Sequence, residues 1–435
     1  MSGQIRTGRC VLAGQRRGEP VSGYGQRPRR AAPIPEDVTT YSAVVTTGIY
    51  CRPGCGARPL AENVRTFELA ASAEAAGFRA CLRCRPYRVA SPIASGAPEL
   101  VCRAVQLIID GVLDTGSEAA LGARLAVSPR HLRRIFNDHL GVTPDQLARS
   151  RRAHFARRLL DDTDLTVADV AFASGFASIR QFNRQMREVF RASPRELRDR
   201  RRRADRLAAD GGLTMRLPFE PPLDWHEMAA FFAGRAVPGV ESVLGRVYRR
   251  TISLDGAPGV LEVHPGGADH LLLRAHLPYW EGLIHVAERA GRMVGADASP
   301  AARTPGAWGP FEAAVQAIVA QECDDLGEAR RQLGGMVERF GPRVPGLTHG
   351  LTHLFPSAEV LAAGDLADSD LPPATVKSLA ALAAGIASGE IVLDHGVRWA
   401  DLVASLTAAT GIKPATAHQI AIRLGLRAPS AALAT

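Results

Sequence analysis

The sequence contains little lysine and few aromatic residues, and it lacks long apolar runs. Lys377 and Lys413 are its lysines, although Lys and Arg together number 53, and Phe, Trp and Tyr make up 6% of 435 residues. No apolar run approaches the roughly 18 residues that a membrane span needs. The first 40 residues also lack an apolar stretch of signal-peptide length. The sequence therefore argues against a membrane span and against secretion, and we expect a cytoplasmic protein.

Cysteine is also scarce. Seven cysteines are an odd number for a disulfide framework, and a cytoplasmic protein keeps its thiols reduced. Apolar residues make up 46% of the chain and charged residues 22%, so packed cores are expected and wholesale disorder is excluded. At roughly 100–200 residues per domain, the length predicts two to four domains.

Charge is distributed unevenly along the chain. Residues 1–210 hold 35 Arg and 21 Asp plus Glu, a net of +14, whereas the remainder holds 18 Lys plus Arg and 23 Asp plus Glu, a net of −5. These values sum to the formal charge of +9. A basic front half favours an anionic polymer, most simply nucleic acid, as partner. The asymmetry carries this inference, because arginine content also follows the base composition of a genome.

Four cysteines stand in two short-spaced pairs, C-x3-C and C-x2-C, separated by 25 residues: Cys51, Cys55, Cys81 and Cys84. This spacing suits a tetrahedral zinc site of four thiolates, and taken alone it favours a structural site. The alternative is an accidental set of buried thiols. The other cysteines, Cys10, Cys102 and Cys323, are interpreted as incidental, and the twelve histidines form no ligand spacing with the four.

The residues around these cysteines resemble the Ada-type methylphosphotriester-accepting zinc domain over residues 43–88. The resemblance lies in Thr46–Cys55, Glu62–Arg65 and Ala76–Pro86. It implies a Zn²⁺ cofactor and makes Cys51 both a zinc ligand and a stoichiometric methyl acceptor. The chemistry is coherent, since a methylated phosphotriester is a modest electrophile that needs a thiolate attacker, and zinc keeps a thiol deprotonated. Methylation would remove one negative charge and should tighten DNA binding.

The middle of the chain has a helical pattern. Residues 117–142 and 166–190 each predict a helix, a turn and a second helix, and Ser128 and Pro129 suit a helix start. An arginine-rich linker helix is expected over 144–160. Two helix-turn-helix units on one rigid helix would set two recognition helices in successive major-groove segments.

The second unit, Val170–Phe176 followed by Phe182 and Phe190–Pro194, resembles the AraC-type DNA-binding domain, and the likeness spans residues 98–200. It implies double-stranded DNA as partner, at methylated backbone and promoter sites, with RNA polymerase as a further partner and a nucleoid location. Arg and Gln or Asn can read base edges, although a phosphate contact is commoner for any single arginine and a solvated charged face is the alternative. The implied DNA-facing residues are Arg130, Arg133, Arg134, Arg180, Gln181, Asn183 and Arg184.

The back half resembles alkylbase DNA glycosylases of the AlkA type. Met215–Phe219, Pro238–Glu241 and Tyr248–Thr251 are similar to that family's small α/β domain, and Trp308–Gln321 is similar to the first helix of its helix-hairpin-helix domain. The hairpin corresponds to Thr410–Ala417. The resemblance implies a flipped-base pocket lined with aromatics and a carboxylate that stabilises the departing sugar cation.

Three positions of the back half depart from this pattern. Lys413 stands where the family has a glycine, so the hairpin is expected to lack backbone freedom there, and Ala415 replaces the pocket tryptophan. No acidic residue follows Asp401, and neither Asp401 nor Glu390 matches the catalytic position. We therefore assign no glycosylase catalytic residue and predict no appreciable base excision. The alternatives for this half are a poorly folding domain, a DNA-binding accessory domain and a working glycosylase.

The sequence as a whole predicts a multidomain α+β protein of the alkylation-damage response. We expect a disordered basic tail over 1–40 (a mis-assigned start or a frameshift is the alternative), a zinc domain over 41–90, an all-α double helix-turn-helix domain over 96–205, a small α/β domain over 213–300, and a truncated all-α helix-hairpin-helix domain over 301–435. The leading hypothesis is a self-methylating repair protein that regulates transcription. An active 3-methyladenine DNA glycosylase is the second, and a DNA-binding regulator without chemistry is the third.

Overall fold

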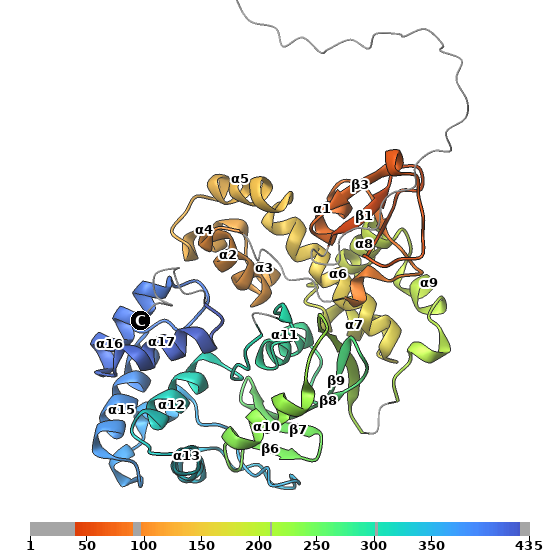
Figure 1. Ribbon diagram of the computed structural model, residues 1–435. Coiled ribbons are helices and arrows are strands. Elements are labelled where there is room, and N and C mark those ends of the chain that lie inside the picture. Colours follow the sequence, from red (N-terminus) through yellow and green to blue (C-terminus); the bar gives the residue numbers. More distant parts are fainter. Residues whose placement is uncertain (1–39, 90–96, 209–210, 301–302, 427–435) are drawn as a thin grey trace, which may run out of the picture.

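The computed structural model describes residues 40–89, 97–208, 211–300 and 303–426, and its architecture is mixed α+β, as the sequence predicts. Along the chain, a small sheet, a group of helices, a second sheet and a second group of helices follow one another (Figure 1). The predicted basic tail falls on residues 1–39, outside the described residues. In the described part of the chain, no helix is both long and apolar enough to cross a bilayer.

The first sheet has the strand order β3-β1-β2-β4. The strand-like run from Tyr41 to Cys51 forms a hairpin of two strands, β1 (Tyr41–Val44) and β2 (Ile49–Cys51). Gly48, with a φ of +64°, makes the reversal between them possible. The remaining elements of this sheet are β3 (Val64–Phe67), α1 (Ala70–Ala75), β4 (Arg79–Ala80) and the short η1 (Ala61–Asn63) and η2 (Pro86–Arg88).

Helices follow the first sheet in the described residues 97–208. They are α2 (Glu99–Ile109), α3 (Val112–Thr115), α4 (Glu118–Arg124), α5 (Pro129–Leu140), α6 (Pro144–Asp162), α7 (Val167–Ala173), α8 (Ile179–Phe190), α9 (Pro194–Asp199) and η3 (Arg203–Asp205). Ser128 and Ser178 cap α5 and α8 by accepting backbone hydrogen bonds, and Thr143 closes a capping box on α6. These caps explain why the sequence locates the helix starts within about one residue.

The second sheet is antiparallel, with the order β5-β9-β8-β7-β6. Side chains of β8 and β9 alternate between buried and less buried positions, which is why these strands are visible in the sequence. Its strands and packed helices are β5 (Leu213–Pro218), α10 (Trp225–Arg235), β6 (Glu241–Leu244), β7 (Val247–Leu254), β8 (Ala257–Pro265), β9 (His270–His276) and α11 (Leu283–Met293).

The last group of helices packs around its own apolar core. It comprises α12 (Pro310–Gln321), α13 (Leu326–Phe340), α14 (Ala358–Ala363), η5 (Leu366–Asp368), α15 (Pro373–Ser388), α16 (Trp399–Thr410) and α17 (Pro414–Arg423). The turn between α16 and α17 corrects one expectation. Gly411 takes the left-handed conformation (φ +70°), whereas Lys413 is the extended N-cap of α17 (φ −64°, ψ 144°). Glycine's backbone freedom is therefore not required at position 413.

Two further cores divide the front of the molecule. One contains α2, α5 and the start of α6, with Phe136 and Leu140 among its buried residues. The other joins the rest of α6 with α8 and continues into the second sheet and α11. The two helix-turn-helix units thus have separate cores that meet along α6, and the second unit shares its core with the back half.

Candidate zinc–thiolate centre and DNA-facing helices

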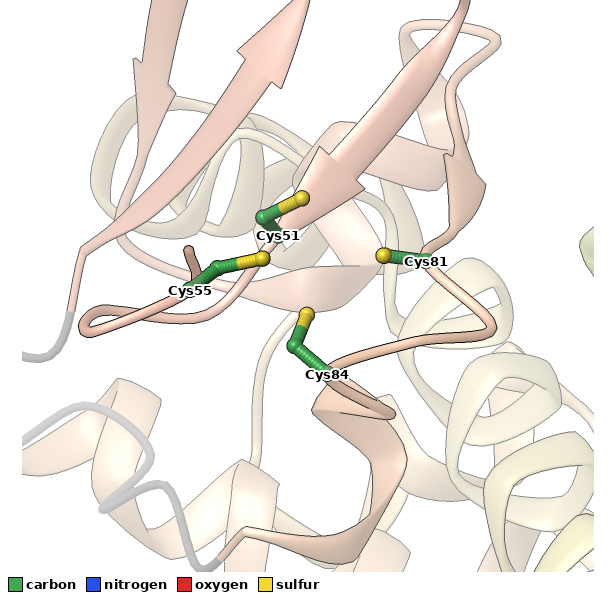
Figure 2. A group of neighbouring side chains, drawn as sticks. All are labelled: Cys51, Cys55, Cys81 and Cys84. Carbon is green, nitrogen blue, oxygen red and sulfur yellow. The ribbon is translucent and has the colours of Figure 1, made fainter. Parts of the chain in front are cut away.

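Neighbouring strand ends and two tight turns bring the four predicted cysteines together. Cys51 ends β2 and Cys81 directly follows β4, and these strands pair in parallel, so both cysteines lie at the same edge. Cys55 follows the turn at Gly54 (φ +73°), and Cys84 closes a turn in which the Arg85 N–H donates to the Cys81 carbonyl. Figure 2 shows the four side chains converging on one centre.

The donor set fits zinc. The four sulfurs all lie within 4.8 Å of one another, and Zn–S bonds of about 2.3 Å in a tetrahedron require sulfurs about 3.8 Å apart. No cysteine of the described residues is in a disulfide. The predicted zinc cofactor is therefore supported by both the spacing of the cysteines and their geometry.

The four thiols shift one another's proton affinities. The pKa of Cys84 is lowered to about 5, chiefly because Cys51 donates a hydrogen bond to its sulfur. The same hydrogen bond, together with burial and the neighbouring sulfurs, raises the pKa of Cys51, and burial raises that of Cys55. Packed sulfurs of this kind resist complete deprotonation by themselves, so a cation is what they need to become thiolates together.

The four cysteines differ in exposure. Cys51 is 6% exposed, whereas Cys55, Cys81 and Cys84 are half-buried. Exposure alone would favour one of those three as the reacting sulfur, and the choice of Cys51 depends on the sequence resemblance. Beside the centre, the exposed Arg83 side chain lies over Gly56, where its Nη2 would be 3.3 Å from an added Cβ.

The structure places the predicted DNA-facing residues on α5 and α8. Arg130, Arg133 and Arg134 are exposed on α5, Arg180 and Arg184 are exposed on α8, and Gln181 and Asn183 are half-exposed there. Two of them are already paired within the chain, because Arg133 contacts Glu118 and Arg184 lies 3.8 Å from Glu188. DNA phosphates would have to replace these partners.

The sequence interpretation missed one residue of the α8 face. Arg187 is exposed and shares a face with Arg180 and Arg184, since the three stand at positions i, i+4 and i+7. The helical spacing of the arginines was the signal that could have identified it.

Family comparisons agree with this arrangement. Three family models match the chain: "Metal binding domain of Ada" over residues 36–87, "Helix-turn-helix domain" over 121–200 and "AlkA N-terminal domain" over 214–304. Among solved structures, a 3-methyladenine DNA glycosylase from Archaeoglobus fulgidus is similar, with 18% identity, a TM-score of 0.41, and coverage of 48% of this chain and 79% of that chain.

Two curated bacterial proteins are similar over longer or shorter parts of the chain. The Escherichia coli (strain K12) protein "Bifunctional transcriptional activator/DNA repair enzyme Ada" is 34% identical over 158 residues, which is 36% of this chain and 43% of its own. The Mycobacterium tuberculosis protein "Probable bifunctional transcriptional activator/DNA repair enzyme AlkA" is 37% identical over 419 residues, which is 89% of this chain and 83% of its own. The chain therefore belongs to the family of bifunctional transcriptional activator/DNA repair enzymes of the AlkA type.

Proposed function

We propose that this protein senses alkylation damage by moving a methyl group from a DNA methylphosphotriester to Cys51, and that the methylated form regulates transcription through α5 and α8. The observation that carries the proposal is the group of four sulfurs within 4.8 Å, on a domain packed against two helix-turn-helix units. A nucleoid location and contact with RNA polymerase follow from the same proposal.

The methyl transfer balances as a single displacement. The Cys51 Sγ attacks the methyl carbon, the S–C bond forms as the C–O bond to phosphorus-bound oxygen breaks, and the electron pair stays on that oxygen. The product is a thioether and an ordinary anionic phosphodiester. Zinc, when bound, keeps the sulfurs deprotonated at neutral pH.

The charge change explains how methylation could act on DNA binding. Four thiolates around one divalent ion carry a net charge of −2, and alkylation of one sulfur leaves −1. A smaller negative charge repels the phosphate backbone less, so affinity for DNA should rise, and this gain should weaken as salt is added.

A Cys51→Ser variant tests the assignment. Full-length wild-type protein should bind one zinc per chain and take up one methyl group from methylphosphotriester DNA, whereas Cys51→Ser should take up none. Cys102→Ser, which removes a half-buried thiol outside the cluster, is the matched control and should behave like wild type. Zinc content is measured by metal analysis and methyl uptake by peptide mass.

The outcomes separate the hypotheses. Methyl capture that survives in Cys51→Ser would contradict the role of Cys51 and point to another sulfur of the cluster. A wild-type protein that binds specific DNA but neither zinc nor methyl groups would leave a regulator without chemistry.

A further inference from the structure

One segment of the zinc domain contacts both helix-turn-helix units. This bridging segment (residues 69–77) contains α1 and the turn after it. Leu69 and Ala71 belong to the core of the first unit, whereas Ala73 belongs to the core of the second. Figure 1 shows α1 lying between α5 and α8, beside α6.

At one end, the bridging segment holds the C-terminus of α5. The buried Ser72 hydroxyl donates a 2.6 Å hydrogen bond to the carbonyl of Leu140, the last residue of the helix. That carbonyl has no partner within its own helix, so the contact satisfies an acceptor that α5 leaves open. Gly141, the C-cap of α5, has a φ of +66°, and an added Cβ there would be in ordinary van der Waals contact with the Ser72 Oγ at 3.5 Å.

At the other end, the zinc domain holds the C-terminus of α8. The ring of Phe190, the last residue of α8, meets the Tyr87 ring edge-on with centroids 5.7 Å apart. The next residue, Arg191, has a left-handed backbone (φ 56°), which is unfavourable for a side-chain-bearing residue. Its guanidinium reaches the Gly77 carbonyl at 3.5 Å.

Between these ends, the segment is tied to α6 and to the cysteine cluster. The Glu74 Oε1 accepts a hydrogen bond from the Tyr50 hydroxyl (2.7 Å) and lies 2.6 Å from the His154 Nε2 on α6. Tyr50 directly precedes Cys51 on β2. These hydrogen bonds therefore connect α6, through Glu74 of the bridging segment, to the residue that precedes the proposed acceptor.

We propose that the bridging segment of the zinc domain positions α5 and α8 relative to each other and so determines which half-site spacing the protein accepts on DNA. Ser72 and Glu74 of the segment are positioning residues, and Tyr87 of the zinc domain and Arg191 at the end of α8 complete the contacts. This inference rests on the proposed function, because it assumes that both helices enter DNA. Two helices that read successive groove segments tolerate only one spacing if a rigid support holds them, and a shift of one base pair misplaces one helix.

The test uses the Ser72→Ala/Arg191→Gly double variant in the full-length, zinc-loaded protein. The glycine relieves the strained backbone at 191 while removing the contact to Gly77, so it separates folding from positioning. Arg195→Ala is the matched control for loss of charge, since Arg195 is exposed on α9 and forms no ion pair within the described residues. Duplexes selected by wild-type protein from a randomised library are remade with one base pair inserted or deleted between the half-sites.

We expect wild-type protein and Arg195→Ala to lose roughly tenfold or more in affinity on the altered spacings. The double variant should bind the three spacings within about threefold of one another, with unchanged zinc content and methyl uptake. Discrimination as sharp as that of wild type would overturn the proposal. If the double variant does not fold, Ser72→Ala alone is used, with the same expected direction and a smaller change. A wild-type protein that selects no duplex would instead overturn the proposed function.

Discussion

At the scale of single residues, Arg250 of the back half is a buried cation that needs buried carboxylate partners. Its guanidinium is 1% exposed and forms two hydrogen bonds to Glu312, at 2.8 and 3.1 Å, while Glu241 lies 3.4 Å away. Trp308 packs against the guanidinium, with 5.2 Å between the Arg250 Cζ and the ring centroid. Arg250 and Glu241 come from the second sheet and Glu312 comes from α12, so this cluster joins the sheet to the last helical group.

Replacement of Arg250 by methionine should destabilise the protein strongly. The substitution keeps an apolar stem but leaves two buried carboxylates without their cation, and breaking a buried pair from one side costs about 3–5 kcal/mol. We expect the free energy of unfolding in urea to fall by that amount. Arg246→Met, at an exposed position of the neighbouring turn, is the control and should change it by less than about 0.5 kcal/mol.

The effect of Arg250→Met should depend on pH. Burial, with Glu312 nearby, raises the pKa of Glu241 even in the presence of Arg250. The folded state therefore binds this proton more tightly than the unfolded state, and the associated stability is present below the ordinary glutamate pKa and lost as the pH rises through the folded value. The deficit of the variant should be largest at neutral pH and should shrink as the pH falls, because protonated carboxyls need no cation. A deficit that is constant with pH would contradict this account.

At the scale of elements, the turn between α16 and α17 contains two positions, Gly411 and Lys413, that differ in their need for glycine. Gly411 is left-handed, and an added Cβ would meet nothing within 4 Å, so Gly411→Ala should cost about 1–2 kcal/mol of unfolding free energy from backbone strain alone. Lys413→Gly should change it by less than about 0.5 kcal/mol. Glycine is an acceptable N-cap, and the ion pair of Lys413 with Glu322 (3.5 Å) is on the surface. Denaturant unfolding of the two variants measures the difference, and equal losses would refute it.

Local sequence signals predict some elements of this fold but not the contacts between distant residues. The starts of α5 and α8 were predictable because Ser128 and Ser178 are local capping signals, and the zinc ligands were predictable because their spacing is local to each pair. The hairpin within 41–51 is not evident from the sequence, since a turn at Gly48 interrupts a run that is strand-like on both sides. The bridging segment could not be predicted, because Glu74 meets His154 across 80 residues and only the packed structure brings them together.

At the scale of the whole molecule, ion pairs and hydrogen bonds join the basic front half to the more acidic back half. Arg151 on α6 pairs with Glu288 on α11 at 2.8 Å, and the buried Asp162 at the end of α6 accepts hydrogen bonds from the backbone and side chain of Arg216 on β5. Asp162 also lies 3.3 Å from Arg88, four residues after the zinc ligand Cys84. The zinc domain, the helix-turn-helix domain and the second sheet therefore meet in one group of charged side chains around Asp162.

We expect this protein to differ from AlkA-type glycosylases in base excision. The carboxylates of the back half nearest in sequence to the predicted motifs are held in ion pairs, Glu312 with Arg250 and Asp401 with Arg398 at 2.7 Å. Loss of an electrostatic group of this kind typically costs about 10²–10³-fold in rate. We predict that incubation with duplexes containing 3-methyladenine yields abasic sites, detected by alkaline strand cleavage, at a rate lower by at least that factor than an AlkA-type enzyme gives.

A fold control makes this last prediction sharp. The same preparation should take up a methyl group on Cys51, so that missing excision cannot be ascribed to an unfolded sample. Its free energy of unfolding should exceed that of Arg250→Met by about 3–5 kcal/mol, which would show that the back half is packed. Excision at rates comparable to an AlkA-type enzyme would show that another carboxylate serves. Asp401→Asn would then identify it, because the Arg398 pair holds the pKa of Asp401 below its usual range and keeps that group ionised. If Asp401→Asn abolished the activity, the surface pair with Arg398 would have to open during catalysis.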